Sequence, residues 1–242
     1  MENNTINHQS RTDYDAQQDL QLKALLSAQD DVWRIFRVMA EFVDGFTLMA
    51  KQKNLVSVFG SARLNPDSKY YQLAVEVAKE LVKHGFNVLT GGGPGIMEAA
   101  NKGAQEQKGD SVGVGIELPL EEDANKYIDR GRLQKFRHFF VRKVMFVKYA
   151  HGFIVMPGGF GTLDEFFEAM TLVQTKKTKA FPIVLMGSDY WKGLVDWIKT
   201  TVVQENMISP EDTDMFHVTD DPVEAATIIE EFYKKNVMIT NF

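Results

Sequence analysis

The segment MPGGFGTLDEFFEAM (residues 156–170) places a glycine-rich turn directly before a carboxylate-bearing segment. Glycine lets a backbone approach a ligand closely, so that successive N–H groups can point at one anion. The helix that follows adds the positive end of its dipole, and Thr162 adds a hydroxyl donor. The sequence therefore predicts a phosphate-binding loop made of Gly158, Gly159, Phe160, Gly161 and Thr162.

Glu165 has two compatible interpretations. The run from Thr162 to Glu165 fits a capping box, in which the Glu165 carboxylate accepts a hydrogen bond from the Thr162 N–H. A carboxylate one turn from a phosphate loop also faces whatever the phosphate is attached to. We expect Glu165 to cap its helix and to face the ligand.

Two cations, Arg142 and Lys143, lie in the segment RHFFVRKVMFVKYA (residues 137–150). This segment is apolar nearly all round, which predicts a largely buried helix. An unpaired charge in a buried element is costly. The two cations therefore either pair with internal carboxylates or face an anionic pocket, and guanidinium suits phosphate and carboxylate alike.

Two further glycine turns, GSAR (60–63) and GGGPG (91–95), also follow short β-rich runs. Ligands of open α/β sheets bind beyond the carboxyl ends of the strands, so three turns at one predicted edge indicate a binding site. The Walker A pattern is absent. The dinucleotide pattern G-x-G-x-x-G is absent too, because Glu98 stands where its last glycine would be. Neither an NTPase nor a nicotinamide dehydrogenase is favoured.

The elements that position these turns alternate between strand and helix, which predicts an α/β fold with a Rossmann-like, doubly wound parallel sheet. Residues 54–242 are expected to form this domain. Residues 1–53 are expected to form a disordered tip and a helical extension, whose apolar stripe from Val32 to Phe46 packs on the domain or on another subunit. The predicted strands are 55–59, 87–90, 111–116, 132–136, 152–156, 181–186 and 215–219, and the main helices are 67–84, 96–107, 138–150, 190–202 and 221–235.

Composition narrows the function classes. The 242 residues include no cysteine, which excludes disulfides, thiolate metal sites and a cysteine nucleophile. Five scattered histidines give no metal-site pattern, and His138 and His151 are interpreted as structural. A net charge of −6 argues against a general nucleic-acid surface. No apolar run suits a signal peptide or a membrane span, so a soluble cytoplasmic protein is expected. The lack of a cysteine or histidine pattern leads us to expect no metal site.

The motif PGGFGTLDE resembles the PGGxGTxxE signature of the LONELY GUY (LOG) family, the cytokinin riboside 5′-monophosphate phosphoribohydrolases, whose members are often labelled lysine decarboxylases. GGGPGIMEAANKGA resembles the second signature of the family, and VRK (141–143) is similar to its Arg-Lys pair. The resemblance covers roughly residues 55–205. The additional terminal helices resemble a longer bacterial branch.

The resemblance implies hydrolysis of the N-glycosidic bond of a nucleoside 5′-monophosphate to free base and ribose 5-phosphate, without a cofactor and in a homo-oligomer. Arg142 and Glu165 are then the catalytic pair. An acidic residue before the Arg-Lys pair also contacts substrate, and Glu117, Glu121 and Glu122 are the candidates. Besides Glu121 and the loop 158–162, the expected substrate contacts are Lys143, Thr171, Gly92, Gly93, Gly95, Met97, Glu98 and Ser61.

Cleavage of the ribosyl C1′–N bond builds positive charge on the sugar. Glu165 could stabilise that charge or deprotonate water, and Arg142 could stabilise the departing base or the phosphate. Plant members carry Met and His where Phe139 and Phe140 stand here, so AMP is the safer substrate prediction than a cytokinin nucleotide.

Two other functions compete. Molybdenum-cofactor carrier proteins resemble the family in fold and glycine signature, but a carrier needs no Arg142–Glu165 pair. A pyridoxal-phosphate decarboxylase needs a lysine Schiff base, and no Ser-x-His-Lys segment is present. The enzyme interpretation is favoured over both.

Overall fold

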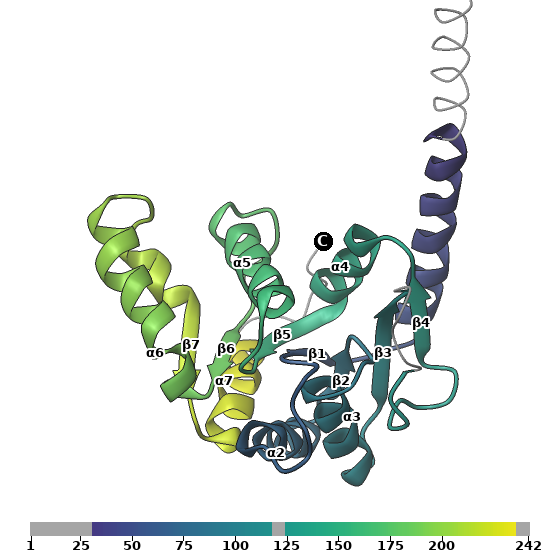
Figure 1. Cartoon of the computed structure of the whole chain (residues 1–242), viewed down its shortest axis with the longest axis horizontal. Helices are drawn as coiled ribbons and strands as arrows, with labels where there is room; N and C mark the ends of the chain where they lie inside the picture. The colour runs from purple at the N-terminus through teal and green to yellow at the C-terminus, as the bar shows by residue number, and fades with distance from the viewer. Residues whose placement is uncertain (1–30, 118–123, 236–242) are drawn as a thin grey trace, which may run out of the picture. The chain divides into compact units, whose positions relative to one another are not determined.

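The structure, a computed structural model, describes residues 31–117 and 124–235. Seven parallel strands form one sheet in the order β4-β3-β2-β1-β5-β6-β7 (Figure 1), which confirms the predicted α/β, Rossmann-like fold. The strands are β1 (Leu55–Phe59), β2 (Asn87–Thr90), β3 (Ser111–Ile116), β4 (Leu133–Phe136), β5 (Ala150–Val155), β6 (Ile183–Met186) and β7 (Phe216–Thr219).

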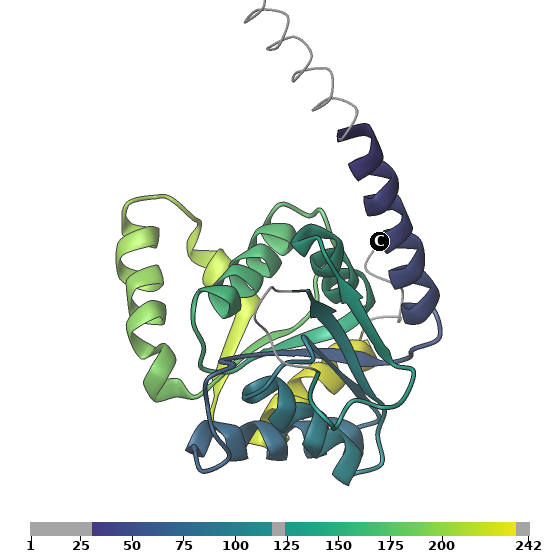
Figure 2. The same cartoon turned by 45° about the vertical axis from the view of Figure 1, so that its right-hand side comes forward.

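Helices cover both faces of the sheet (Figures 1 and 2). One face carries α2 (Lys69–Lys83), α3 (Ile96–Glu106) and α7 (Pro222–Lys235), and the other carries α4 (Phe139–Tyr149), α5 (Phe160–Gln174) and α6 (Ser188–Trp197). A π-helical segment, Ile198–Val202, continues α6, and a 3₁₀ helix, Pro210–Met215, precedes β7. Within the described ranges, no helix is long and apolar enough to cross a membrane.

The core beneath the sheet depends on a close approach of α2 and α3. Apolar residues of α2 recur at helical spacing, and Ala74, Ala78 and Leu81 are fully buried. A Cβ at Gly103 of α3 would lie 2.3 Å from the carbonyl oxygen of Val75, so only glycine allows the two helices to pack this closely.

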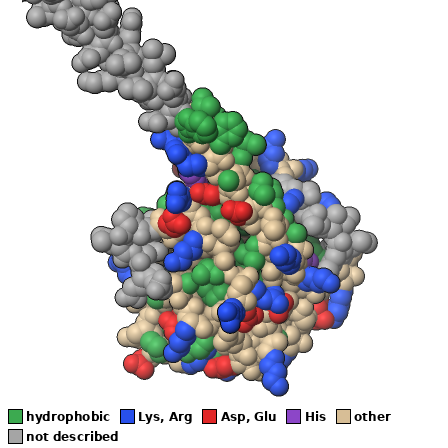
Figure 3. Space-filling model, turned by 90° about the vertical axis from the view of Figure 1, so that its right-hand side faces the viewer, with side chains coloured by type: hydrophobic (Ala, Val, Ile, Leu, Met, Phe, Trp, Pro, Cys, Tyr) green, Lys and Arg blue, Asp and Glu red, His purple; other side chains and the backbone are tan. Residues whose placement is uncertain are grey.

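The chain divides into two compact units at the Val43–Asp44 bond, whereas the sequence predicted the boundary after residue 53. The division falls inside a helix over residues 31–49. Apolar side chains gather on the surface of this helix (Figure 3). The exposed ones are Val32, Trp33, Ile35, Phe36, Met39, Val43 and Phe46.

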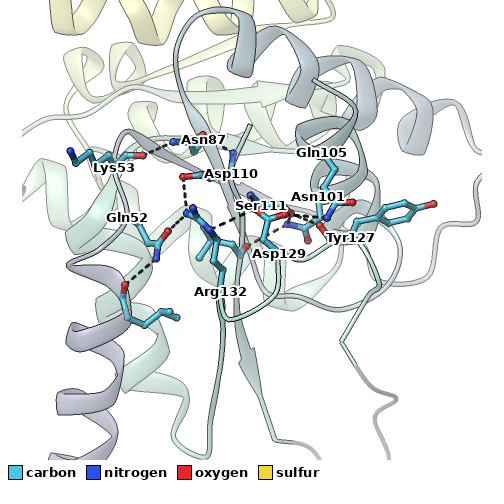
Figure 4. A network of polar contacts seen from close by, with 12 residues as sticks. Gln52, Lys53, Asn87, Asn101, Gln105, Asp110, Ser111, Tyr127, Asp129 and Arg132 are labelled. Carbon is cyan, nitrogen blue, oxygen red and sulfur yellow. Dashed lines mark hydrogen bonds and ion pairs between the residues drawn. The ribbon is translucent and has the colours of Figure 1, made fainter. Parts of the chain in front are cut away.

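A polar network joins the segment before β1 to the β2–β4 side of the sheet (Figure 4). Arg132 donates to the Gln52 side chain, and its guanidinium lies 2.7 Å from the Asp110 carboxylate. The Asn87 amide donates to the Lys53 carbonyl at 2.9 Å. The entry into the first strand is therefore held by side-chain bonds as well as by the sheet.

Candidate active site

The strand order reverses between β1 and β5, which lie side by side at the middle of the sheet. Their last residues, Phe59 and Val155, are register partners, so the turns that follow both strands leave the sheet at the same place. In open α/β sheets this reversal opens a crevice beyond the strand ends where ligands bind. The predicted convergence of the glycine turns is thus confirmed for GSAR and PGGFGT.

Direct backbone bonds join all three turns. The Ser61 N–H donates to the Pro157 carbonyl at 3.0 Å, and the Ile96 N–H donates to the Ser61 carbonyl at 2.9 Å. Gly95 has a φ of +69°, and a Cβ there would lie 2.3 Å from the Ser61 carbonyl oxygen. Only glycine therefore fits at position 95, where the turns GSAR and GGGPG meet.

The turn before α5 and the first residues of α5 contain glycines of two kinds. A Cβ at Gly158 would lie 2.1 Å from Thr162 Oγ1, so packing within the loop excludes a side chain. A Cβ at Gly159 or Gly161 would meet no protein atom within 4 Å, and neither residue has a positive φ. Protein packing does not explain these two glycines, whereas a ligand lying against the loop would.

The loop lines a cavity of about 830 Å³. Besides residues 157–163, its walls include Ser61 from the first turn, Met97 from α3, Arg142 from α4, Glu165 from α5 and Tyr190 from α6. An α-helix leaves its first N–H groups without acceptors, and at the start of α5 the N–H groups of Phe160 and Gly161 make no backbone bond to a described residue. The cavity therefore combines anion-binding backbone with a cation and a carboxylate.

Arg142 and Glu165 meet in this cavity. Arg142 Nη2 lies 4.0 Å from Glu165 Oε1. The guanidinium lies near the rings of Phe139 and Phe146, at 5.2 and 5.7 Å from their centroids. Glu165 is only 4% exposed, and its Oε2 has no hydrogen-bond partner among the described residues. A buried carboxylate oxygen without a partner is costly, and a ligand in the cavity could supply one.

Lys143 pairs with carboxylates instead. Its ammonium lies 2.7 Å from Glu168, 2.9 Å from Asp164 and 3.2 Å from Glu165, and it does not line the cavity. Burial lowers the pKa of Lys143, but the hydrogen bonds to Glu168 and Asp164 outweigh burial, so the pKa is raised. Of the two interpretations left open for the cations, internal pairing applies to Lys143, and Arg142 faces the cavity.

The environment of Glu165 disfavours its charge. Burial raises the pKa of Glu165 above its ordinary value, while the Lys143 and Arg142 charges act in the opposite direction. A carboxylate with a raised pKa in a cleft is a feature of catalytic acids and bases.

The capping-box prediction for Glu165 was wrong. Helix α5 begins at Phe160 with Gly159 as its N-cap, so Thr162 lies inside the helix. The N–H groups of Thr162 and Leu163 both donate to the Gly159 carbonyl at 3.0 Å. Because Gly159 carries no side chain, the backbone alone makes this start, and the Glu165 carboxylate remains available to Lys143 and the cavity.

The other predicted contacts divide into two groups. Ser61 and Met97 line the cavity, whereas Gly92, Gly93 and Gly95 shape the turn behind it. Glu98 does not line the cavity. Its carboxylate interacts with the hydroxyl of Tyr71, and burial together with the Glu98 charge raises the pKa of Tyr71 to about 12.

Two predicted contacts lie away from the cavity, and one lies outside the described residues. The Thr171 hydroxyl donates to the Phe167 carbonyl at 2.7 Å, on an exposed part of α5. Glu117 is exposed and forms an ion pair of 3.0 Å with Arg137. Glu121, like Glu122, lies outside the described residues.

The expectation that α4 is largely buried was wrong at its start. Phe139 and Phe140 are 48% and 53% exposed, and the buried face comprises Val141, Met145, Phe146 and Val147. Among residues 31–117 and 124–235, no group of three or more His, Cys, Asp or Glu side chains could hold a metal ion.

Tyr190 is a cavity residue that the sequence did not reveal. Its hydroxyl donates to the Gly158 carbonyl at 2.6 Å. The only sequence signal is an aromatic residue shortly after Gly187, at the start of the helix that follows β6.

Curated proteins and solved structures resemble this chain. A pyrimidine/purine nucleotide 5′-monophosphate nucleosidase of Escherichia coli K12 is 30% identical over 167 residues, covering 62% of this chain and 35% of the relative. The match thus spans about a third of that relative's length. A probable cytokinin riboside 5′-monophosphate phosphoribohydrolase of Arabidopsis thaliana is 30% identical over 161 residues, covering 65% of this chain and 78% of the relative.

Solved structures show the same fold. An X-ray structure of the protein TM1055 has a TM-score of 0.55 at 26% identity, covering 74% of this chain and 99% of that one. The molybdenum cofactor binding protein of Rippkaea orientalis has a TM-score of 0.52 at 20% identity, covering 78% and 99%. A family model described as "Possible lysine decarboxylase" matches residues 97–229. The chain therefore belongs to the LOG family, also described as possible lysine decarboxylases.

Proposed function

We propose that this protein hydrolyses the N-glycosidic bond of nucleoside 5′-monophosphates, with AMP as the first substrate to test, giving free base and ribose 5-phosphate. The observation that supports this most is the meeting of Arg142 and Glu165 beside the glycine loop in one cavity. The names of the relatives from E. coli and A. thaliana support the same reaction class.

The proposed pose follows from the chemistry of the walls. The 5′-phosphate lies against the open backbone of Gly159 and Gly161 at the start of α5, where N–H groups and the helix dipole favour an anion. The ribose then faces Glu165, one turn further along the helix. The substrate supplies partners for the buried Oε2.

In the proposed reaction the C1′–N bond breaks and the base leaves with the bonding electrons. Positive charge develops on the ribose ring, which the Glu165 carboxylate stabilises. The oxygen of water then adds to C1′, and Glu165 accepts one of its protons. The base takes up a proton at the released nitrogen, and Arg142 stabilises negative charge on the base or the phosphate.

A nucleotide panel tests this proposal. The protein is incubated with AMP, GMP, CMP, IMP and N6-isopentenyl AMP, and free base is measured by chromatography. Glu165→Gln and Arg142→Ala are the test variants. Glu231→Gln, on the exposed surface of α7, is the matched control. We expect base release by the parent and the control, and its loss in both test variants.

The competing proposal is a carrier that binds a phosphate-bearing cofactor without cleaving it. The fold likeness to the molybdenum cofactor binding protein is the observation that favours it. Tight nucleotide or cofactor binding without base release from any nucleotide would contradict the hydrolase and support the carrier. A yellow chromophore after purification would instead indicate bound pyridoxal phosphate.

We also propose that the protein is a homo-oligomer and that the helix over residues 31–49 contributes to its interface. Its exposed apolar side chains are the basis, because a row of such residues on one helix is typical of a contact surface. Phe36→Asp should then lower the mass measured in solution by light scattering. An unchanged mass would contradict this role of the helix.

A further inference from the structure

We propose that Tyr190 is a positioning residue of the phosphate loop. Its hydroxyl holds the Gly158 peptide so that the loop presents N–H groups to an anion. The proposal rests on the proposed function in one respect, namely that this loop binds a 5′-phosphate.

The contact joins two elements that are far apart in the sequence. Tyr190 lies in the first turn of α6, and its Oη donates to the Gly158 carbonyl at 2.6 Å. This carbonyl belongs to the loop that α5 follows, and Tyr190 also lines the cavity. The bond therefore links this loop to α6, the helix that follows the next strand, β6.

Two consecutive carbonyls of the loop are held in this way. The Pro157 carbonyl accepts from the Ser61 N–H at 3.0 Å, and the Gly158 carbonyl accepts from Tyr190. A trans peptide points its C=O and the following N–H in opposite directions. The N–H groups of Gly158 and Gly159 consequently point away from Ser61 and Tyr190. Neither N–H donates to a backbone carbonyl of the described residues, which leaves both open to a ligand.

Tyr190 is itself held before any ligand arrives. Its ring packs edge-on against Tyr70 and Trp191, with centroids 6.4 and 4.9 Å away. The start of α6 is anchored because the Ser188 N–H donates to the Asp220 carboxylate at 2.7 Å. The Ser188 hydroxyl also donates to this carboxylate, and the hydroxyl and the N–H together lower the pKa of Asp220, which keeps its carboxylate charged. A group fixed in advance loses little entropy on binding, which favours a role in preorganising the loop.

The alternative is that Tyr190 only packs α6 against its neighbours. Tyr190→Phe separates the two, because it keeps the ring and removes the hydroxyl. Tyr127→Phe is the matched control, since Tyr127 lies outside the cavity and its ring contacts Lys126.

The test measures phosphate binding and catalysis separately. Inorganic phosphate and ribose 5-phosphate are titrated into the parent and both variants by calorimetry, and kcat and KM are measured with AMP. We expect Tyr190→Phe to weaken both ligands about three- to tenfold, as for one lost hydrogen bond. KM for AMP should rise by the same factor with kcat within twofold, because phosphate contacts act on substrate and transition state alike. Tyr127→Phe should match the parent.

A loss of affinity smaller than threefold would overturn the proposal, and so would a fall in kcat at unchanged KM. A parent protein that binds neither phosphate nor ribose 5-phosphate would overturn it as well. Phosphate binding that depends on Tyr190, without hydrolysis of any nucleotide, would support this proposal while contradicting the proposed function.

Discussion

The guanidinium of Arg142 and the carboxylate of Glu165 lie 4.0 Å apart, although they come from different helices on one face of the sheet. Lys143, next to Arg142, lies 3.2 Å from the same carboxylate oxygen. One helix thus supplies two cations to one buried carboxylate. Only Arg142 lines the cavity, so the two cations have different tasks.

Glu165→Gln should lower kcat/KM for AMP by at least about 100-fold, because a neutral amide neither stabilises a cationic ribose nor accepts a proton. Glu168→Gln is the matched control, since Glu168 also contacts Lys143 but does not line the cavity. We expect the control to lose less than tenfold. Equal losses in the two variants would show that the charge around Lys143, and not Glu165 itself, is what matters.

The acid limb of the pH profile of kcat/KM should lie above pH 4.5, the ordinary value for a glutamate, because burial raises the pKa of Glu165. The charged form is required, so activity should fall as pH falls through this raised pKa. A profile measured with AMP from pH 4 to 8 checks this. A limb at or below the ordinary value would contradict a buried, cation-flanked catalytic carboxylate.

The same raised pKa has a consequence for stability. The folded state holds a proton on Glu165 over a pH range in which the unfolded chain has released it. The contribution of this group to the free energy of unfolding therefore falls as pH rises from 4.5 through the folded pKa. Glu165→Gln should be more stable than the parent at neutral pH, with a smaller difference at pH 4. Urea denaturation at both pH values measures it, and a less stable variant at pH 7 would contradict it.

Gly161→Ala should change the stability of the fold and the affinity for AMP in opposite directions. A methyl group there meets no protein atom within 4 Å, and alanine in a helix stabilises by about 0.5–1 kcal/mol relative to glycine. The methyl group would, however, occupy space that we assign to the phosphate, so AMP affinity should fall about tenfold or more. Gly193→Ala, at an equally open position of α6, is the control and should gain stability without losing affinity. Unchanged AMP affinity in Gly161→Ala would place the phosphate elsewhere.

Gly95→Ala should destabilise the protein by roughly 2 kcal/mol or more, because it combines a positive φ with a clash against the Ser61 carbonyl. Gly85 has a φ of +84°, but a Cβ there would meet no atom within 4 Å, so Gly85→Ala should cost only about 1 kcal/mol. The difference in thermal midpoint isolates the close approach of the two turns. Equal midpoints would mean that the turns can separate without cost.

Local patterns predicted most of the fold. All seven strands were placed to within two residues at both ends. The 3₁₀ helix Pro210–Met215 was missed, although the Ser209 and Asp212 capping box before it was legible in the sequence. The exposure of Phe139 and Phe140 was missed because periodicity alone does not show which turn of a helix extends past its neighbours.

The sequence predicted which residues form the site better than it predicted the contacts that these residues make. Arg142, Glu165 and the glycine loop came together because parallel strands end at one edge. The pairing of Lys143 with Glu168 and the bond from Tyr190 to Gly158 depend on how α4, α5 and α6 pack, which no local pattern encodes. The capping box failed because a glycine N-cap let α5 begin before Thr162.

The most direct test of the central claim is the fate of AMP in water enriched in ¹⁸O, followed by mass spectrometry of all products. Hydrolysis at C1′ predicts free adenine and ribose 5-phosphate carrying one ¹⁸O on C1′, formed by the parent and lost in Glu165→Gln. Adenosine with labelled phosphate, or AMP recovered intact while bound to the protein, would contradict the assignment of this cavity as a phosphoribohydrolase site.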